Sequence, residues 1–450
     1  MRKAASIIIS LLIVFTFVIK AFSQEIHEAV VKGDIQKVKE IVKKNPDSVA
    51  MFNKDNITPL HYASQHGYKE IAEFLISMGA SLTAVDNNKE IPLHFAAQHG
   101  KTEIVKLLID KGSKTDIKNI NGRLPLHLAV LFGHIEIVSL LIEHGSNINE
   151  VSNEGRTPLY DAMGPKKDDI VAMLIANGAK INIKDNNGVS PIITAAERGR
   201  KETIELLIKS GANVNDQDNK GIAPLFHSAF FGENEIIEIL LSNHADINIK
   251  DNEGNTAVFR PIYFNKLQTL KFLVDKGAKW NIKNKYGQTL LHQAAIFGDI
   301  EMVRYLLDKG IDINSVDQQG FSALHFAGKY GHKNIADLLI TKGAKAKNIE
   351  ENYNNSQYLN KKLKQEEAFI WYLYDLGVAV KTKSSLLIFD YYEPSWDLKV
   401  ENPCLANGRI DPQEIKHLNV YVFVSCKRQH NYSRIIFNWE KDVDNITYVF

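Results

Sequence analysis

The stretch Thr58-Pro59-Leu60-His61-Tyr62-Ala63 predicts a helix start, because threonine is a frequent N-cap residue and proline is tolerated at the first helical position. Close variants of this stretch return every 33 residues, nine times along the chain. They begin at Thr58, Ile91, Leu124, Thr157, Ser190, Ala223, Thr256, Thr289 and Ser322. A fixed period of this length predicts a stacked array of small units, each of which contacts only its neighbours.

The fifth repeat shows what each unit contains. Residues 186–188 (Asn-Asn-Gly) indicate a tight turn, and Pro191 begins a short helix that ends near Gly199. Apolar residues at helical spacing over 204–208 predict a second helix, and Gly211 suits a left-handed cap. Each unit is therefore expected to be a turn, a short helix, a loop and a longer helix.

The stretch at 58–63 and the run Leu126-His127-Leu128-Ala129 resemble the signature of the ankyrin repeat family, over about residues 53–349. The resemblance implies a mostly α fold, an ankyrin-repeat solenoid of nine repeats. It also implies a concave groove and finger-like turns that bind a protein partner. Residues 25–52 resemble a worn first unit and are expected to form N-terminal capping helices with one wet face.

Three repeats depart from the pattern. In the seventh, Pro261 falls inside the first helix, where proline removes a hydrogen bond and clashes with the preceding turn. The fourth carries Gly164-Pro165 where its first helix should end, and the sixth has His244 at a glycine position. We expect local irregularity at all three places.

The N-terminus predicts export. Arg2 and Lys3 precede an apolar run over 4–19, and residues 21–23 (Ala-Phe-Ser) suit an export peptidase. We therefore predict a signal peptide over 1–23, cleaved before Gln24, and a periplasmic or secreted protein. The alternative is a membrane anchor that stays uncleaved, because 16 apolar residues lie near the lower limit for a span.

The overall composition suggests no further ligand. The formal net charge of the 450-residue chain is +1, so it carries no basic footprint for nucleic acid and none for a membrane after signal cleavage. We expect a monomer without cofactors. The two cysteines, Cys404 and Cys426, could form a disulfide in an exported chain.

Histidine recurs at one position of the repeat, in His61, His94, His127, His292 and His325. Neighbouring units stack at about 10 Å, one helix diameter, whereas zinc needs nitrogen donors at about 2.1 Å from one centre. One histidine per unit cannot share an ion. We therefore predict no metal site and no catalytic residue here, and the family resemblance implies that each histidine bonds back to the helix cap.

Aromatic residues gather at the seventh and eighth positions after the cap, where the resemblance implies that the first helix faces the groove. The candidate binding residues are Phe132, Phe230, Phe231, Tyr263, Phe264, Phe297 and Tyr330. Exposed apolar stripes often mark contact surfaces, so these residues are candidate anchors for a partner. The alternative is that they pack against the next unit. The first two repeats carry Gln-His at these positions, which predicts a polar end to the groove.

The last hundred residues follow another pattern. A polar linker is expected over 350–367, followed by β-branched and aromatic runs at 368–373, 378–382, 386–390 and 420–424 that predict strands. Ile370-Trp371-Tyr372-Leu373, Leu387-Ile388-Phe389-Asp390 and Val422-Phe423-Val424-Ser425 resemble the opening of a metallo-β-lactamase-like hydrolase. The resemblance implies that residues 368–450 are a truncated form of that domain, because its later ligands would lie beyond Phe450.

The resemblance also places a metal loop at Cys426-Lys427-Arg428-Gln429-His430-Asn431. Arginine cannot ligate zinc, and only Cys426 and His430 could do so, which leaves too few ligands. We therefore predict a protein without enzymatic activity, an exported scaffold that binds another protein. Two alternatives remain: a metal-dependent hydrolase whose repeats position the substrate, and a secreted effector that binds host proteins.

Overall fold

The computed structural model describes residues 23–345 throughout and, beyond them, the backbone of short strands between 369 and 448. The chain forms two compact units, residues 1–228 with 233–251 and residues 229–232 with 252–450. The predicted signal sequence before Ser23, the linker over 350–367, Cys404 and Cys426 lie outside the described residues. In the part of the chain that is described, no helix combines the length and the hydropathy needed to cross a membrane.

The described residues begin with a pair of helices. One covers residues 23–31, and the second is α2 (Ile35–Lys44), capped by Asp34, whose carboxylate accepts from the Lys37 N–H at 2.9 Å. A 3-10 helix, η1 (Pro46–Ala50), follows. Helices therefore occupy most of 25–52, and Pro46 begins η1 because proline suits the first position of a helical turn.

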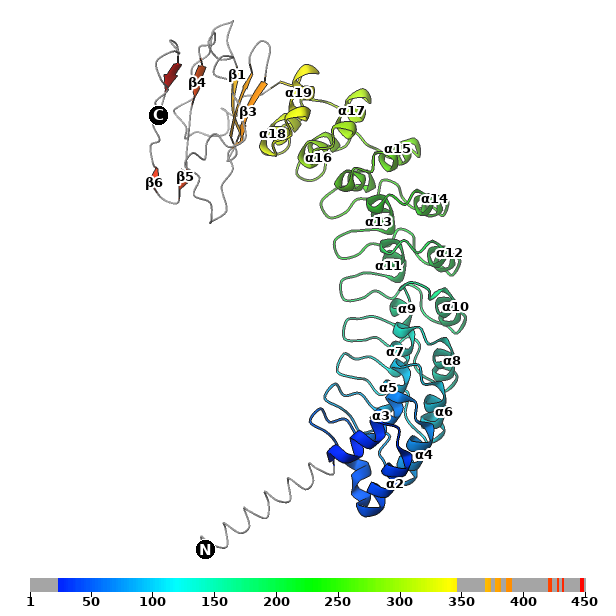
Figure 1. Cartoon of the computed structure of the whole chain (residues 1–450). Helices are drawn as coiled ribbons and strands as arrows, with labels where there is room; N and C mark the ends of the chain where they lie inside the picture. Colours follow the sequence, from blue (N-terminus) through cyan, green and yellow to red (C-terminus); the bar gives the residue numbers. More distant parts are fainter. Residues whose placement is uncertain are drawn as a thin grey trace. The chain divides into compact units, whose positions relative to one another are not determined.

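Nine repeats of paired helices follow, so the predicted mostly helical array of 33-residue repeats is confirmed. The first helices are α3 (Pro59–His66), α5 (Pro92–Gln98), α7 (Pro125–Phe132), α9 (Pro158–Asp161), α11 (Pro191–Glu197), α13 (Pro224–Phe231), η2 (Ala257–Phe264), α16 (Leu290–Phe297) and α18 (Ala323–Lys329). The second helices are α4 (Lys69–Ser77), α6 (Thr102–Asp110), α8 (Ile135–Glu143), α10 (Asp168–Ala176), α12 (Lys201–Lys209), α14 (Asn234–Ser242), α15 (Leu267–Asp275), α17 (Ile300–Asp308) and α19 (Lys333–Thr341). In the first unit, α3 to α11 form one column and α4 to α12 another (Figure 1).

The core runs between the helices of each repeat and its neighbours. In α6, Ile104, Val105 and Leu108 are fully buried, and α8 repeats the same spacing. Burying one such side chain stabilises the fold by roughly 1.5–3 kcal/mol relative to leaving it exposed. The regular spacing therefore lets each repeat bury an apolar stripe that it could not bury alone.

The repeated histidines connect consecutive repeats. His94 Nδ1 accepts from the Ile91 N–H at 3.2 Å, and Nε2 donates to the carbonyl of Arg123 in the next repeat at 3.1 Å. His61, His127 and His292 make the equivalent pair of bonds. Because Nδ1 accepts, the ring proton lies on Nε2 and the ring is neutral. Burial then lowers the pKa of His94 and His127 to about 4.

Two of the three expected irregularities are present, and the third, at His244, is not, because the backbone there keeps the conformation of the other repeats. Helix α9 ends at Asp161 after four residues, ahead of the Gly-Pro pair. The first helix of the seventh repeat is the 3-10 helix η2, with Pro261 inside it. His244 takes a positive φ of 70°, the left-handed conformation that glycine adopts at that position elsewhere.

Short strands lie in the C-terminal part of the chain. β1 (Phe369–Leu373), β2 (Gly377–Lys381) and β3 (Leu386–Asp390) pair antiparallel in that order. β4 (Val420–Val422) pairs in parallel with β7 (Ile446–Tyr448), and β5 (Lys427–Arg428) pairs antiparallel with β6 (Asn431–Tyr432). The residues compared with a metal loop therefore include a short strand pair.

Candidate protein-interaction site

Exposed aromatic side chains gather in the second unit. Phe231, Tyr263, Phe264, Phe297 and Tyr330 are between 37% and 55% exposed, and Phe230 is half-buried. We call these six residues the aromatic face. Most exposed apolar side chains on a folded domain are scattered singly, so a set of this size at equivalent positions is a candidate contact surface.

The rings of the aromatic face contact one another across repeats. The ring centroids of Phe230 and Phe264 lie 4.7 Å apart in an edge-to-face arrangement, and those of Phe230 and Phe231 lie 5.1 Å apart. Tyr263 reaches Phe297 with 4.8 Å between centroids. The rings therefore pack against rings of the next repeat, as the alternative expects. They nevertheless remain partly exposed.

The ends of the first helices position the aromatic face. Phe231, Phe264 and Phe297 are the last residues of α13, η2 and α16. After η2 the chain turns at Asn265, whose φ is +54°, and after α16 at Gly298, whose φ is +79°. A left-handed residue ends a helix sharply, so each aromatic side chain stays on the last turn instead of being covered by a continuing helix.

Two lysines lie beside the aromatic face. The side chain of Lys266 lies over Gly232, since a Cβ added there would meet Lys266 Cδ at 3.1 Å. Lys329 Nζ lies 6.0 Å from the ring centre of Tyr330. Among the carboxylates of this unit, Asp299 is buried and bonds to backbone N–H groups at the start of α17. The Asp299 carboxylate is therefore already engaged in capping α17.

The seventh candidate, Phe132, lies in the first unit and is 50% exposed. The structure thus brings five of the seven candidates into ring contact, places Tyr330 in the same unit, and leaves Phe132 in the other unit. Within the first unit, the equivalent positions of the first repeats hold polar residues: His66 stacks near Tyr62 and Tyr68, and His99 stacks near Phe95.

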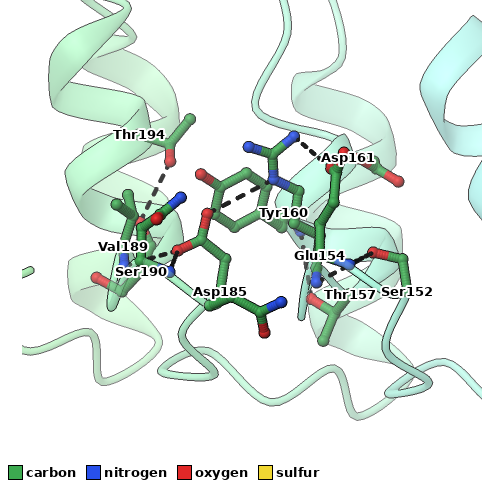
Figure 2. A network of polar contacts seen from close by, with 12 residues as sticks. Ser152, Glu154, Thr157, Tyr160, Asp161, Asp185, Val189, Ser190 and Thr194 are labelled. Carbon is green, nitrogen blue, oxygen red and sulfur yellow. Dashed lines mark hydrogen bonds and ion pairs between the residues drawn. The ribbon is translucent and has the colours of Figure 1, made fainter. Parts of the chain in front are cut away.

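A buried polar network in the first unit is not predicted by the sequence reading. Figure 2 shows this network, which includes Tyr160 and Asp161 of one repeat and Asp185 at the start of the next. The Arg156 guanidinium lies 4.8 Å from the Tyr160 ring centre, and its Nε is 3.6 Å from an Asp185 oxygen. The Asp185 side chain also accepts from two backbone N–H groups of its own turn, those of Asn187 and Val189, each at 2.9 Å. This carboxylate therefore holds a turn in shape.

Asp161 is less well satisfied than Asp185. Its side chain is 4% exposed, and its closest cation is Arg123, with 3.7 Å between Arg123 Nη2 and Asp161 Oδ1. Within the described residues, Asp161 Oδ2 has no hydrogen-bond partner. Burial raises the pKa of Asp161 to about 6, although the positive charges of Arg123, Arg156 and Lys167 oppose that rise. The sequence signal was weak: the first three repeats carry Tyr62, Phe95 and Leu128 at this position, but later repeats carry polar residues there, including Thr194 and Arg260.

A second unpredicted feature lies in the loop between the two helices. His134 Nε2 donates to the Gln98 carbonyl at 3.0 Å, and Lys167 Nζ donates to the Leu131 carbonyl at 2.6 Å. Arg200 donates in the same way to the carbonyl of Gly164, and His332 to that of Ile296. Three of these carbonyls lie at the end of the preceding repeat's first helix, where such groups lack an intrahelical partner, and Gly164 follows the short α9 by three residues.

Comparison with known proteins identifies the repeats. The family model described as ankyrin repeats (3 copies) matches residues 26–119, 93–185, 164–251 and 255–350. Two curated relatives are protein phosphatase 1 regulatory subunit 27 of Mus musculus, 39% identical over 66 residues, and its Homo sapiens counterpart, 38% identical over 66 residues. Each match covers 15% of this chain and 42% of the relative, so the chain spans less than half the length of the curated relatives it matches.

Proposed function

We propose, because this chain belongs to the ankyrin repeat family, that it is a scaffold without enzymatic activity that binds another protein. The aromatic face carries the proposal. Interface hot spots are rich in aromatic side chains, and truncating one of them typically costs 2 kcal/mol or more of binding free energy. A rigid repeat scaffold presents such anchors at little cost in conformational entropy on binding.

The curated relatives are consistent with this proposal. Their printed name describes a regulatory subunit of a protein phosphatase, and a regulatory subunit acts by binding another protein. The shared region is only 66 residues long, so it supports the general role and gives no identity for the partner. The concave groove and the finger turns that the family resemblance implies would extend the contact beyond the aromatic face.

The double variant Phe231→Ser with Phe264→Ser is expected to lower partner capture at least about tenfold, because two exposed anchors are removed. Purified full-length protein would be used as bait in the exported fraction, and capture would be quantified for each variant. Both side chains are about half exposed, so the thermal melting temperature should move little.

Phe132→Ser is the matched control, since it removes an equally exposed phenylalanine at the same repeat position in the other unit. It should leave capture unchanged. A double variant that loses helical stability along with capture would assign the rings to the core and contradict the proposal. An equal loss of capture in the double variant and in Phe132→Ser would also contradict it.

The absence of catalysis is part of the proposal, and the sequence of residues 426–431 supports it. Arg428 stands where the hydrolase resemblance would need a ligand, and the loop offers only Cys426 and His430. Metal analysis of the purified full-length protein separates this reading from the metal-dependent hydrolase. Two equivalents of tightly bound zinc would support the hydrolase.

Export is also proposed, from the charged start and the apolar run of residues 1–23. N-terminal sequencing of the mature protein should then begin at Gln24. A protein that keeps Met1 and stays with the membrane fraction would instead be anchored. Cell fractionation distinguishes a periplasmic scaffold from an effector that is released and binds host proteins.

A further inference from the structure

We infer that the aromatic face binds an extended, acidic segment of a partner protein, one that carries apolar or aromatic anchor residues. This inference rests on the proposed scaffold function and specifies the partner's chemistry. Two independent observations point to it: the grouping of exposed rings in the second unit, and the sign of the charge on the repeats that present four of the six.

The rings supply anchoring without sequence-specific polar contacts. Phe230, Phe264 and Tyr263 form a continuous set of ring contacts, with Phe231 and Phe297 at its ends. Such a surface offers ring edges and faces against which apolar side chains of a ligand can pack. An extended segment suits it, because the rings recur once per repeat and alternate side chains of an extended chain point the same way.

Charge distinguishes this part of the array from the rest. Residues 252–345 contain 13 lysines and arginines against 8 aspartates and glutamates, whereas residues 23–251 contain 25 against 31. Four of the six rings, Tyr263, Phe264, Phe297 and Tyr330, therefore lie on repeats with an excess of positive charge, whereas Phe230 and Phe231 end the first helix of the repeat before them. A potential of one sign over a contact surface favours partners of the opposite sign and speeds their association.

Basic side chains also lie beside the rings themselves. Lys266 covers Gly232, the residue after Phe231, and Lys329 lies over Tyr330, the outermost ring. Among the described residues, neither lysine has a carboxylate within ion-pair distance, whereas Lys69 and Lys201 in the first unit do. Lys266 and Lys329 are therefore available for carboxylates of a ligand that spans the face.

The expected preference is modest, because exposed ion pairs contribute roughly 0.2–1 kcal/mol each. Two or three pairs together give about a tenfold tighter Kd for an acidic ligand at low salt, with most of the gain in the association rate. Screening should reduce the preference severalfold between about 50 mM and 500 mM salt, as the Debye length falls from about 14 Å to about 4 Å.

The test uses full-length protein and two fluorescent 12-residue peptides that share the same tryptophan, leucine and phenylalanine anchors. In one peptide every remaining residue is glutamate or glycine, and in the other every glutamate is replaced by lysine. Fluorescence anisotropy at low and high salt should give at least about tenfold tighter binding of the glutamate peptide at low salt. Phe264→Ser should weaken both peptides.

The charge partners are tested by Lys266→Glu with Lys329→Glu, which should abolish the preference for the glutamate peptide. Lys101→Glu is the matched control, because Lys101 occupies the same repeat position in the first unit and covers Gly67 as Lys266 covers Gly232. The control should keep the preference. All these side chains are on the surface, and circular dichroism would verify the fold of each variant.

Each other outcome overturns the inference in a recognisable way. Equal binding of both peptides, or tighter binding of the lysine peptide, refutes the charge argument and leaves the scaffold function intact. No binding of either peptide refutes the extended segment, and the capture experiment then decides the scaffold function separately. A dimer that Phe264→Ser dissolves would assign the face to a second copy, and tighter binding of a single-stranded oligonucleotide would assign it to nucleic acid.

Discussion

Replacing Asp161 with asparagine is expected to stabilise the repeat array at pH 7 by about 3 kcal/mol, although it removes a charge that lies next to two arginines. The cause is desolvation. Asp161 is buried, and its Oδ2 lacks a partner within the described residues. The cationic atom nearest to its carboxylate, Arg123 Nη2, is 3.7 Å from Oδ1. The loose ion pair does not offset the cost of burying the charge, which is why the pKa of Asp161 rises to about 6.

The effect should depend on pH with a definite sign. The folded-state pKa of Asp161 is about 6 and its ordinary value is 3.8, so the folded chain binds this proton more readily than the unfolded chain. Its contribution to stability is therefore complete below about pH 4 and is lost as pH rises to about 6. Arg123, Arg156, Lys167 and Glu154 are the charged groups that face it. The advantage of Asp161→Asn should disappear near pH 4.

Asp185→Asn is the contrasting control in the same network. The Asp185 carboxylate accepts from the N–H groups of Asn187 and Val189, so losing its charge should cost about 1 kcal/mol. Urea unfolding of both variants at pH 7 and at pH 4 measures the difference. If Asp161→Asn destabilises the array at pH 7, the pair with Arg123 is a net stabilising interaction and the desolvation argument is wrong.

His94→Ala is expected to cost about 3 kcal/mol of unfolding free energy at pH 7. The substitution leaves the buried Ile91 N–H without its acceptor, removes a donor to the Arg123 carbonyl, and opens a cavity between two repeats. His144→Ala is the control, because His144 is exposed and bonds only to Leu140 in its own helix. It should change the unfolding free energy by less than about 0.5 kcal/mol.

The cost of His94→Ala should shrink in acid. Burial lowers the pKa of His94 to about 4 from an ordinary value of 6.5, so the unfolded chain binds this proton more readily than the folded chain. Stability from His94 is therefore complete above about pH 6.5 and is lost as pH falls towards 4, by about 2 kcal/mol at pH 5. The wild type loses this amount and His94→Ala does not. At pH 5 the unfolding free energies of the two proteins should therefore differ by about 1 kcal/mol, measured by urea denaturation. A gap that is constant with pH would contradict the neutral-ring assignment.

The sequence predicts the repeat architecture well, because each helix boundary has a local cause. Pro191 begins a helix, Pro261 distorts one, and the Gly-Pro pair after Asp161 shortens α9, all through rules that act within one turn. The exposed rings are also accessible to sequence reasoning, since their position in the repeat fixes their direction. Their binding role stays a prediction.

The polar networks could not be predicted in the same way. Arg123 meets Asp161 and Arg156 meets Asp185 across 38 and 29 residues of sequence, and such pairs leave no periodic pattern in the sequence. The loop donors, such as Lys167 to the Leu131 carbonyl, are equally hidden because the acceptor is backbone. The residue type at the Asp161 position gives little signal either, because Thr194, Arg260 and Gln293 occupy the same position in later repeats.

The histidine bonds have a consequence for how such a chain can change length. Four of these histidines donate from Nε2 to a backbone carbonyl 29 residues ahead. The acceptors belong to Glu90, Arg123, Arg156 and Phe321, whose side chains differ, so the bond does not depend on the side chain of the acceptor residue. Any repeat that copies the backbone turn can therefore accept the bond. Unequal recombination that inserts or removes whole 33-residue modules would re-form the junction without a compensating substitution, so gene duplication can lengthen the array in single steps.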